Sequence, residues 1–152
     1  MLSPTAAFHC SELSFGSKLH IASIALRDRV LRMPLGLAYT PQELQAEAGE
    51  WHLAVHDGSA LFAVLLLRKT IPDHCEVLKM RQVAVDTPLQ GKGIGARLVR
   101  FAEDVAREQG CRRIELHARE QAVPFYRKLG YSTEGEWFEE VGLPHLAMYR
   151  NL

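Results

Sequence analysis

The residues best suited to chemistry in this chain are three alternate glycines, Gly91, Gly93 and Gly95, at the start of a helical pattern. The first four N–H groups of a helix lack intrahelical partners, and the helix dipole adds positive potential there. Glycine has no side chain that would keep an anion away from these donors. The segment therefore predicts a binding site for a phosphate or pyrophosphate.

The spacing of these glycines argues against two familiar phosphate-binding loops. A Walker loop requires Gly-x-x-x-x-Gly-Lys-Ser/Thr, whereas Lys92 is followed by Gly93. A dinucleotide fingerprint requires Gly-x-Gly-x-x-Gly, which the chain also lacks here. Two alternatives stay open on this segment alone. One is a nucleotide- or phosphate-binding enzyme of another class, and the other is a tight strand-to-helix turn without a ligand.

A second segment, Gln121-Ala122-Val123-Pro124-Phe125-Tyr126-Arg127-Lys128-Leu129-Gly130-Tyr131, predicts a short helix that carries a tyrosine. It resembles the A-x-x-F/L-Y-x-K-x-G-F/Y helix of the GNAT family of N-acetyltransferases. Gln90-Gly91-Lys92-Gly93-Ile94-Gly95 resembles the family's Gln/Arg-x-x-Gly-x-Gly/Ala signature. The resemblance covers residues 76–150, and residues 136–148 resemble the subgroup of small bacterial acetyltransferases similar to ElaA. It implies an acetyl-CoA-dependent N-acetyltransferase.

The resemblance also implies which residues hold coenzyme A. Backbone N–H groups of the glycine segment would contact the pyrophosphate, and the main chain of residues 83–85 would pair with pantetheine and polarise the acetyl carbonyl. The side chains of Val83 and Val85 are expected in the core. Arg119 stands where many members carry asparagine, seven residues before Tyr126. The predicted cofactor-binding residues are Val83, Ala84, Val85, Gln90, Gly91, Lys92, Gly93, Ile94, Gly95, Ala96, Arg119, Tyr126 and Lys128.

Acetyl transfer to an amine requires an acid for the departing thiolate and a deprotonated amine. The resemblance implies that Tyr126 is the acid, and the alternative is an aromatic residue packed beside Phe125. Glu76 and His145 are the candidate bases, the first because relatives often use a carboxylate near the start of that strand. A water relay would need no dedicated base. Further candidates are His74, His117, Glu139 and Glu140.

No metal site is predicted. His52 and His56 alternate along a strand without a carboxylate at ligand spacing, which favours surface positions for both. Cys10, Cys75 and Cys111 are odd in number and form no C-x-x-C pair. This pattern argues against a disulfide framework and favours a reducing cytoplasm.

Composition limits the class of acceptor. Lysine plus arginine equal aspartate plus glutamate at 18 each, so no overall field points to nucleic acid or a membrane surface. No apolar run approaches the length of a membrane span, and the first residues lack a secretory pattern. We therefore expect a small-molecule or peptide amine as the partner, and a homodimer stays open.

The elements that position these residues alternate along the chain. Apolar periodicity and turn signals predict helices over 18–32, 41–48, 93–109 and 122–129, and strands over 52–56, 60–69, 76–85, 112–118, 131–138 and 145–150. We predict one domain over residues 1–152 with an α/β (α+β) fold. Its central sheet is mixed and mostly antiparallel, with helices on both faces. The resemblance adds a splayed parallel strand pair that ends at Val85 and Ala118.

Two other functions compete with the acetyltransferase. A coenzyme A-binding sensor or interaction module without turnover would use the same cofactor segment. A phosphate-binding enzyme of another class would need a magnesium carboxylate or a ribose-binding acid, which the sequence does not offer at the expected positions. The first two helices and the last hairpin set acceptor specificity in the family, and neither carries a decisive pattern here.

Overall fold

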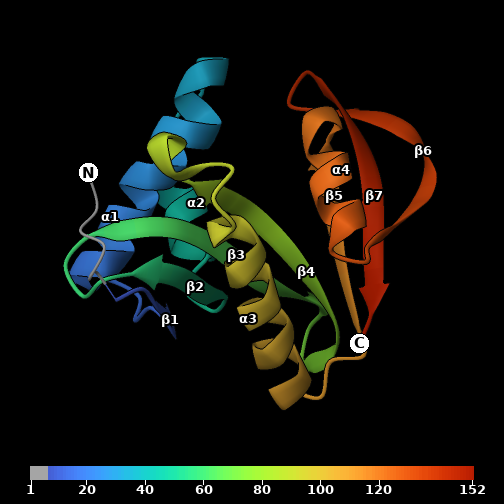
Figure 1. Cartoon of the computed structure of the whole chain (residues 1–152), viewed down its shortest axis with the longest axis horizontal. Helices are drawn as coiled ribbons and strands as arrows, with labels where there is room; N and C mark the ends of the chain where they lie inside the picture. Colours follow the sequence, from blue (N-terminus) through green and yellow to red (C-terminus); the bar gives the residue numbers. More distant parts are fainter. Residues whose placement is uncertain (1–6) are drawn as a thin grey trace. The chain divides into compact units, whose positions relative to one another are not determined.

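The computed structural model describes residues 7–152 (Figure 1). Its strands hydrogen-bond in the order β1-β2-β3-β4-β5-β7-β6. The strands are β1 (His9–Glu12), β2 (Trp51–His56), β3 (Leu61–Ile71), β4 (His74–Val85), β5 (Arg113–Arg119), β6 (Ser132–Glu140) and β7 (Leu143–Asn151). The α-helices are α1 (Lys18–Arg27), α2 (Pro41–Ala46), α3 (Ile94–Glu108) and α4 (Val123–Lys128).

The predicted fold class is confirmed. The sheet is mixed, with antiparallel pairs β1·β2, β2·β3, β5·β7 and β6·β7. Its parallel pair joins Val77–Lys79 of β4 to Arg113–Glu115 of β5. Residues 62–67 of β3 are all buried, which is the pattern of a strand covered on both faces. In Figure 1, α1 lies behind β3 and the start of α3 lies in front of it.

Two elements differ from the sequence prediction. The predicted helix over 18–32 is α-helical only to Arg27 and continues as a π-helical turn, Asp28–Arg32, and a 3-10 turn, Met33–Leu35. Gly36 then ends it with φ 69°. The short strand β1 was not predicted, because its sequence His-Cys-Ser-Glu does not alternate apolar and polar residues.

The chain divides into two compact units, which we describe separately. The first unit comprises the described residues up to Arg68 together with Gln82–Ala102, and the second comprises Lys69–Arg81 and Glu103–Leu152. Within residues 7–152, no helix is both long and apolar enough to cross a membrane.

The first unit buries an apolar cluster between α1 and the sheet. Leu26 of α1 packs with Val64 and Leu66 of β3 and Ala84 of β4. Side chains two residues apart in a strand share a face, so Val64 and Leu66 both point toward α1. Leu65 lies on the opposite face of β3 and is fully buried as well. This packing fixes α1 against the end of β4, immediately before the glycine segment.

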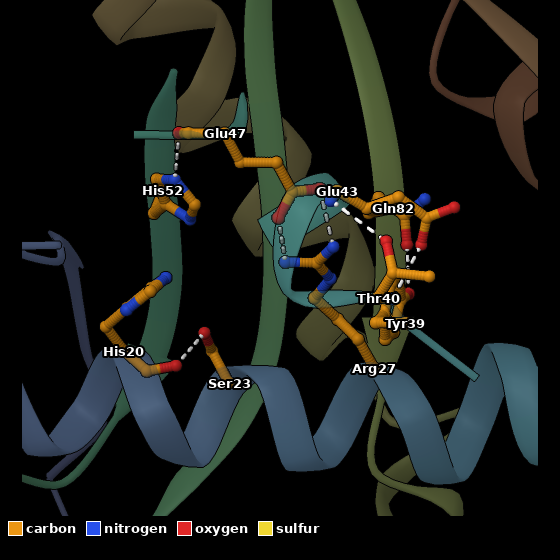
Figure 2. Close-up of polar contacts among 9 residues, drawn as sticks. All are labelled: His20, Ser23, Arg27, Tyr39, Thr40, Glu43, Glu47, His52 and Gln82. Carbon is orange, nitrogen blue, oxygen red and sulfur yellow. Dashed lines mark hydrogen bonds and ion pairs between the residues drawn. The ribbon is translucent and has the colours of Figure 1, made fainter. Parts of the chain in front are cut away.

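A buried polar network also connects the elements of the first unit (Figure 2). The guanidinium of Arg27 lies over the ring of Tyr39, 4.7 Å from its centroid, and donates two hydrogen bonds to Glu47. The Tyr39 hydroxyl donates to the side-chain oxygen of Gln82 in β4. The next residue after Tyr39, Thr40, caps α2. These contacts tie α1, the start of α2 and β4 together.

A capping box begins α2. The Thr40 hydroxyl accepts a hydrogen bond from the Glu43 N–H at 3.1 Å, and the Glu43 carboxylate accepts one from the Thr40 N–H at 3.1 Å. Pro41 follows at the first helical position. The two bonds satisfy N–H groups that a helix start leaves unpaired, so the sequence alone determines where α2 begins.

The second unit is organised by the register of β5, β7 and β6. Ile114 of β5 lies opposite Arg150 of β7, and cross-strand partners share one face of the sheet. Arg150 donates to the carboxylate of Glu103 in α3 at 2.6 Å, and Tyr131 donates to the same carboxylate at 2.9 Å. The face that carries Ile114 is therefore the one that α3 and Tyr131 cover. Side chains alternate between the two faces along a strand, so His117, three residues after Ile114, points to the other face.

Candidate active site

The predicted anion site lies in the first unit, between β4 and α3. Gly91 and Gly93 have φ angles of 77° and 82°, and a Cβ at either would meet nothing within 4 Å. Glycine is therefore required at these positions by backbone conformation and not by space. The preceding Gln90 donates from its side-chain amide to the Val85 carbonyl at 3.0 Å, which attaches the loop to the end of β4.

The loop presents a row of unbonded donors. Within residues 7–152, the backbone N–H groups from Gly91 to Ala96 have no hydrogen-bond acceptor, and the first bond of the helix start runs from the Arg97 N–H to the Gly93 carbonyl at 3.1 Å. Gly91, Lys92 and Gly93 are exposed. Six consecutive free N–H groups at the positive end of a 15-residue helix suit an anion with several oxygens, such as a pyrophosphate.

The strand before this loop corrects one expectation. Val83 and Val85 were expected in the core, but both are only half-buried, and Ala84 is the buried residue. The reason is that Ala84 occupies the face of β4 that packs against Leu26, so its neighbours point to the other face. The same strand contains an unusual residue, Gln82, with φ 56°.

Tyr126 lies in α4 of the second unit and is buried. Its ring packs edge-on against Phe125 and Tyr131, with centroids 5.0 and 5.8 Å away. In the part of the chain that the structure describes, its hydroxyl has no hydrogen-bond partner. Burial raises the pKa of Tyr126 far above its usual value. The phenol thus stays protonated at neutral pH and keeps its donor available, as a general acid must.

A second polar group in the same unit joins three predicted candidates. His117 Nδ1 lies 2.9 Å from Glu140 Oε1, and His145 Nε2 lies 3.6 Å from Glu140 Oε2. Burial would raise the pKa of Glu140, but the hydrogen bond from His117 and the charges of His117, His145 and Lys79 lower it overall. The carboxylate is therefore ionised at neutral pH. We call these three residues the His117–Glu140–His145 cluster.

The other predicted residues lie elsewhere. Glu76 is exposed near the start of β4, where its carbonyl accepts a hydrogen bond from the N–H of Arg112, so it lies at the opposite end of β5 from His117. The structure does not bring Glu76 and His145 together. Arg119 is half-buried at the end of β5, directly opposite His145 in β7. Lys128 is exposed at the end of α4.

The surface positions expected for His52 and His56 were wrong. Both are buried: the ring of His52 packs against His20 of α1, with centroids 4.8 Å apart, and His56 pairs with His9 of β1. His52 Nε2 donates to the Glu47 carbonyl at 2.8 Å, and His56 Nε2 lies 2.7 Å from Ser11 Oγ. Both histidines thus have structural partners. Over residues 7–152, no three His, Cys, Asp or Glu side chains are grouped so that they could hold a metal ion.

Sequence reasoning named each member of the His117–Glu140–His145 cluster but did not join them. The missing information was the strand register, which pairs Arg119 with His145, Phe138 with His145 and Glu140 with Leu143. A two-residue turn at Val141-Gly142, where both residues have positive φ, sets the hairpin register. The Val-Gly pair was a usable signal for this turn, although valine is rare at positive φ.

Comparison with known proteins establishes the family. Residues 20–131 match the acetyltransferase (GNAT) family. The chain therefore belongs to this family. It is 32% identical over 74 residues to an uncharacterised Bacillus subtilis protein, YyaT, and the match covers 49% of this chain and 50% of YyaT. The chain thus spans about half the length of this curated relative.

Solved structures agree on the fold. Escherichia coli ElaA superposes with a TM-score of 0.76 at 22% identity, over 95% of this chain and 98% of ElaA. An aminoglycoside 6′-N-acetyltransferase in complex with coenzyme A superposes with a TM-score of 0.75 at 18% identity, over 94% of this chain and 96% of that protein. The two likenesses show that the fold is that of the acetyltransferases.

Proposed function

We propose that this protein transfers the acetyl group of acetyl-CoA to a primary amine of a small molecule or peptide. The observation that carries the proposal is the row of free N–H groups from Gly91 to Ala96 in a chain of the GNAT family. A family neighbour, the aminoglycoside 6′-N-acetyltransferase, was solved with coenzyme A. The loop suits the pyrophosphate of that molecule because Gly91, Lys92 and Gly93 are exposed and the unbonded donors lie at a helix start.

The proposed chemistry is a direct transfer in which the chain's own residues have separate roles. When bound, acetyl-CoA supplies an activated acetyl group as a thioester. The free N–H groups of residues 91–96 hold the pyrophosphate, and the main chain of residues 83–85 is proposed to orient the pantetheine arm. The neutral amine attacks the acetyl carbon, a C–N bond forms and the C–S bond breaks. Tyr126 gives its phenolic proton to the sulfur, and the nitrogen loses its extra proton to a base.

The charge balance supports a class of acceptor, and the cysteine pattern supports a cellular compartment. The net charge is zero, with 18 acidic and 18 basic residues, which favours a small amine or peptide over nucleic acid. The odd number of cysteines, without a C-x-x-C pair, favours the reducing cytoplasm. The possible homodimer is a separate question. Sedimentation at several protein concentrations would measure the oligomeric state.

The test is an amine panel with acetyl-CoA and a free-thiol readout, run beside calorimetry with coenzyme A. We expect calorimetric binding and thiol release that depends on a primary amine. Binding without turnover on any amine would favour the sensor module. No binding by the folded protein would contradict the assignment of the cofactor loop and with it the whole proposal.

A further inference from the structure

We propose that His117 is the base that accepts the proton of the acceptor amine, that Glu140 orients it, and that His145 is a positioning residue behind Glu140. The inference rests on the proposed acetyl transfer and names the group that completes it. All three residues belong to the second unit and come from three neighbouring strands, β5, β6 and β7.

His117 has one bonded and one available ring nitrogen. Its Nδ1 lies 2.9 Å from Glu140 Oε1, and because the ionised carboxylate only accepts, Nδ1 carries the proton and donates. In the neutral ring, Nε2 then holds a lone pair. Among the described residues Nε2 has no hydrogen-bond partner, and the side chain is 34% exposed. An exposed imidazole nitrogen with a fixed tautomer is a suitable general base.

A second histidine, His145, lies next to Glu140. His145 Nδ1 lies 2.9 Å from the Leu143 carbonyl, which only accepts, so Nδ1 of His145 donates. Its Nε2 faces the second oxygen of Glu140 at 3.6 Å, and its side chain is only 4% exposed. A substrate therefore has little access to His145. This burial is why we assign the base to His117 and a positioning role to His145.

An aromatic ring fixes the orientation of both imidazoles. Phe138 packs edge-on against His117, with centroids 4.9 Å apart, and stacks on His145 at 6.0 Å. Phe138 and His145 are directly paired across β6 and β7. The ring limits rotation of His117 away from Glu140, so the proton-accepting nitrogen keeps one direction.

Charged groups of both signs surround His117. Lys79 of β4 places Nζ 3.4 Å from His117 Nδ1, on the nitrogen that already donates to Glu140, so this contact is electrostatic and not a second hydrogen bond. Along β5, Glu115 and Arg119 share its face. Glu115 is engaged with Arg113 at 2.9 Å. From β6 and β7 the facing groups are Glu140 and His145.

Acid and base lie on opposite faces of β5. Tyr126 packs edge-on against Tyr131, which is hydrogen-bonded to Glu103 on the face covered by α3. His117 occupies the other face, one residue after Leu116, whose side chain is buried. The amine proton would therefore reach His117 Nε2 through a bridging water and go on to solvent, while Tyr126 gives its own proton to sulfur. One proton leaves the nitrogen and one joins the sulfur, so the step balances.

The test compares His117→Ala with His9→Ala, an exposed histidine at the start of β1, as the matched control. We expect His117→Ala to lower kcat/KM by about a hundredfold, the scale of a general base, and to remove the rising limb of its pH profile. Added imidazole should restore part of the rate. Coenzyme A affinity by calorimetry and the thermal midpoint should match those of the control, because the side chain is exposed.

A second variant, Glu140→Gln, separates orientation from proton transfer. It should lower kcat/KM about tenfold. Added imidazole should not restore the rate, because the base is present but misaligned. If His117→Ala retains the wild-type rate and the rising limb of the pH profile of kcat/KM, His117 is not the base. If it raises only KM for the amine while kcat stays unchanged, the cluster binds the acceptor and the base assignment is overturned. Absence of turnover in the wild type instead contradicts the proposed function itself.

Discussion

Arg27 and Glu47 form a bidentate ion pair inside the first unit, with guanidinium nitrogens 2.9 and 2.7 Å from the two carboxylate oxygens. Their side chains are 0% and 4% exposed. Desolvation opposes the charge on Arg27, but its hydrogen bonds to Glu47 and the nearby Tyr39 raise its pKa overall. Both charges therefore depend on each other.

Breaking this pair should be costly. Glu47→Gln leaves the buried guanidinium without a compensating charge, so we expect a loss of about 3–5 kcal/mol in the free energy of unfolding, measured by urea denaturation. The control is Asp104→Asn, which breaks an exposed ion pair with Arg107 in α3 and should change stability by less than about 1 kcal/mol. Equal effects of the two variants would show that burial does not determine how much an ion pair contributes to the free energy of unfolding.

Gly93→Glu should abolish coenzyme A binding. The substitution brings a carboxylate to the free N–H groups that the phosphate would use, and like charges repel. It also forces a side chain into positive φ, which costs about 1–2 kcal/mol. Gly58→Glu is the matched control, because Gly58 has φ 98° and an open surface but lies in the β2–β3 turn. Calorimetry should show binding by the control and none by Gly93→Glu; retained binding in both would remove the loop from the cofactor site.

Tyr126→Phe should lower kcat without loss of stability. The Tyr126 hydroxyl has no partner within residues 7–152, so its removal breaks no bond of the fold. Loss of one proton-transfer contribution predicts a fall in kcat of roughly ten- to several-hundredfold, with little change in coenzyme A affinity.

Tyr131→Phe should do the reverse of Tyr126→Phe. It removes a 2.9 Å hydrogen bond to buried Glu103, so it should lower the unfolding free energy by about 1–3 kcal/mol and leave kcat largely intact. A wild-type kcat in Tyr126→Phe would reduce Tyr126 to a packing residue.

Acid should weaken the first unit through His20. Burial, followed by the charges of His52 and Arg27, lowers the pKa of His20 from its usual 6.5, while Glu47 opposes the shift. The unfolded chain then binds the proton at a higher pH than the fold, so stability falls as pH drops below about 6.5 toward the folded pKa. His20→Asn offers an acceptor for the Gly16 N–H, which bonds His20 Nδ1 at 3.0 Å, and lacks the titration. Urea unfolding at pH 8 and pH 5.5 should show a smaller difference in the variant than in the wild type.

Local signals in the sequence predicted much of the framework. The Thr40-Pro41-Gln42-Glu43 cap and the glycine at the end of α3 act through neighbouring backbone groups, and Gly110 has a positive φ of 81°. The glycine loop was predicted from the same kind of signal. Such features depend on contacts within a few residues, so the sequence contains the information they need.

Long-range features could not be predicted in this way. The burial of Arg27 depends on Glu47, which is 20 residues away, and the ring of His52 packs against His20 of α1. The His117–Glu140–His145 cluster depends on the register of three strands. That register includes an irregularity between Glu134 and Phe138, which no local pattern determines.

The unbonded N–H groups from Gly91 to Ala96 should also affect hydrogen–deuterium exchange in this segment. Peptide hydrogens that lack an acceptor and lie at the surface exchange with deuterium oxide without a structural opening, whereas bonded ones wait for one. The exposed residues Gly91, Lys92 and Gly93 should therefore take up deuterium early while the later turns of α3 stay protonated. An anion that accepts from these groups would slow the uptake in this segment alone, so mass spectrometry of the peptide could detect cofactor occupancy before any acceptor amine is known.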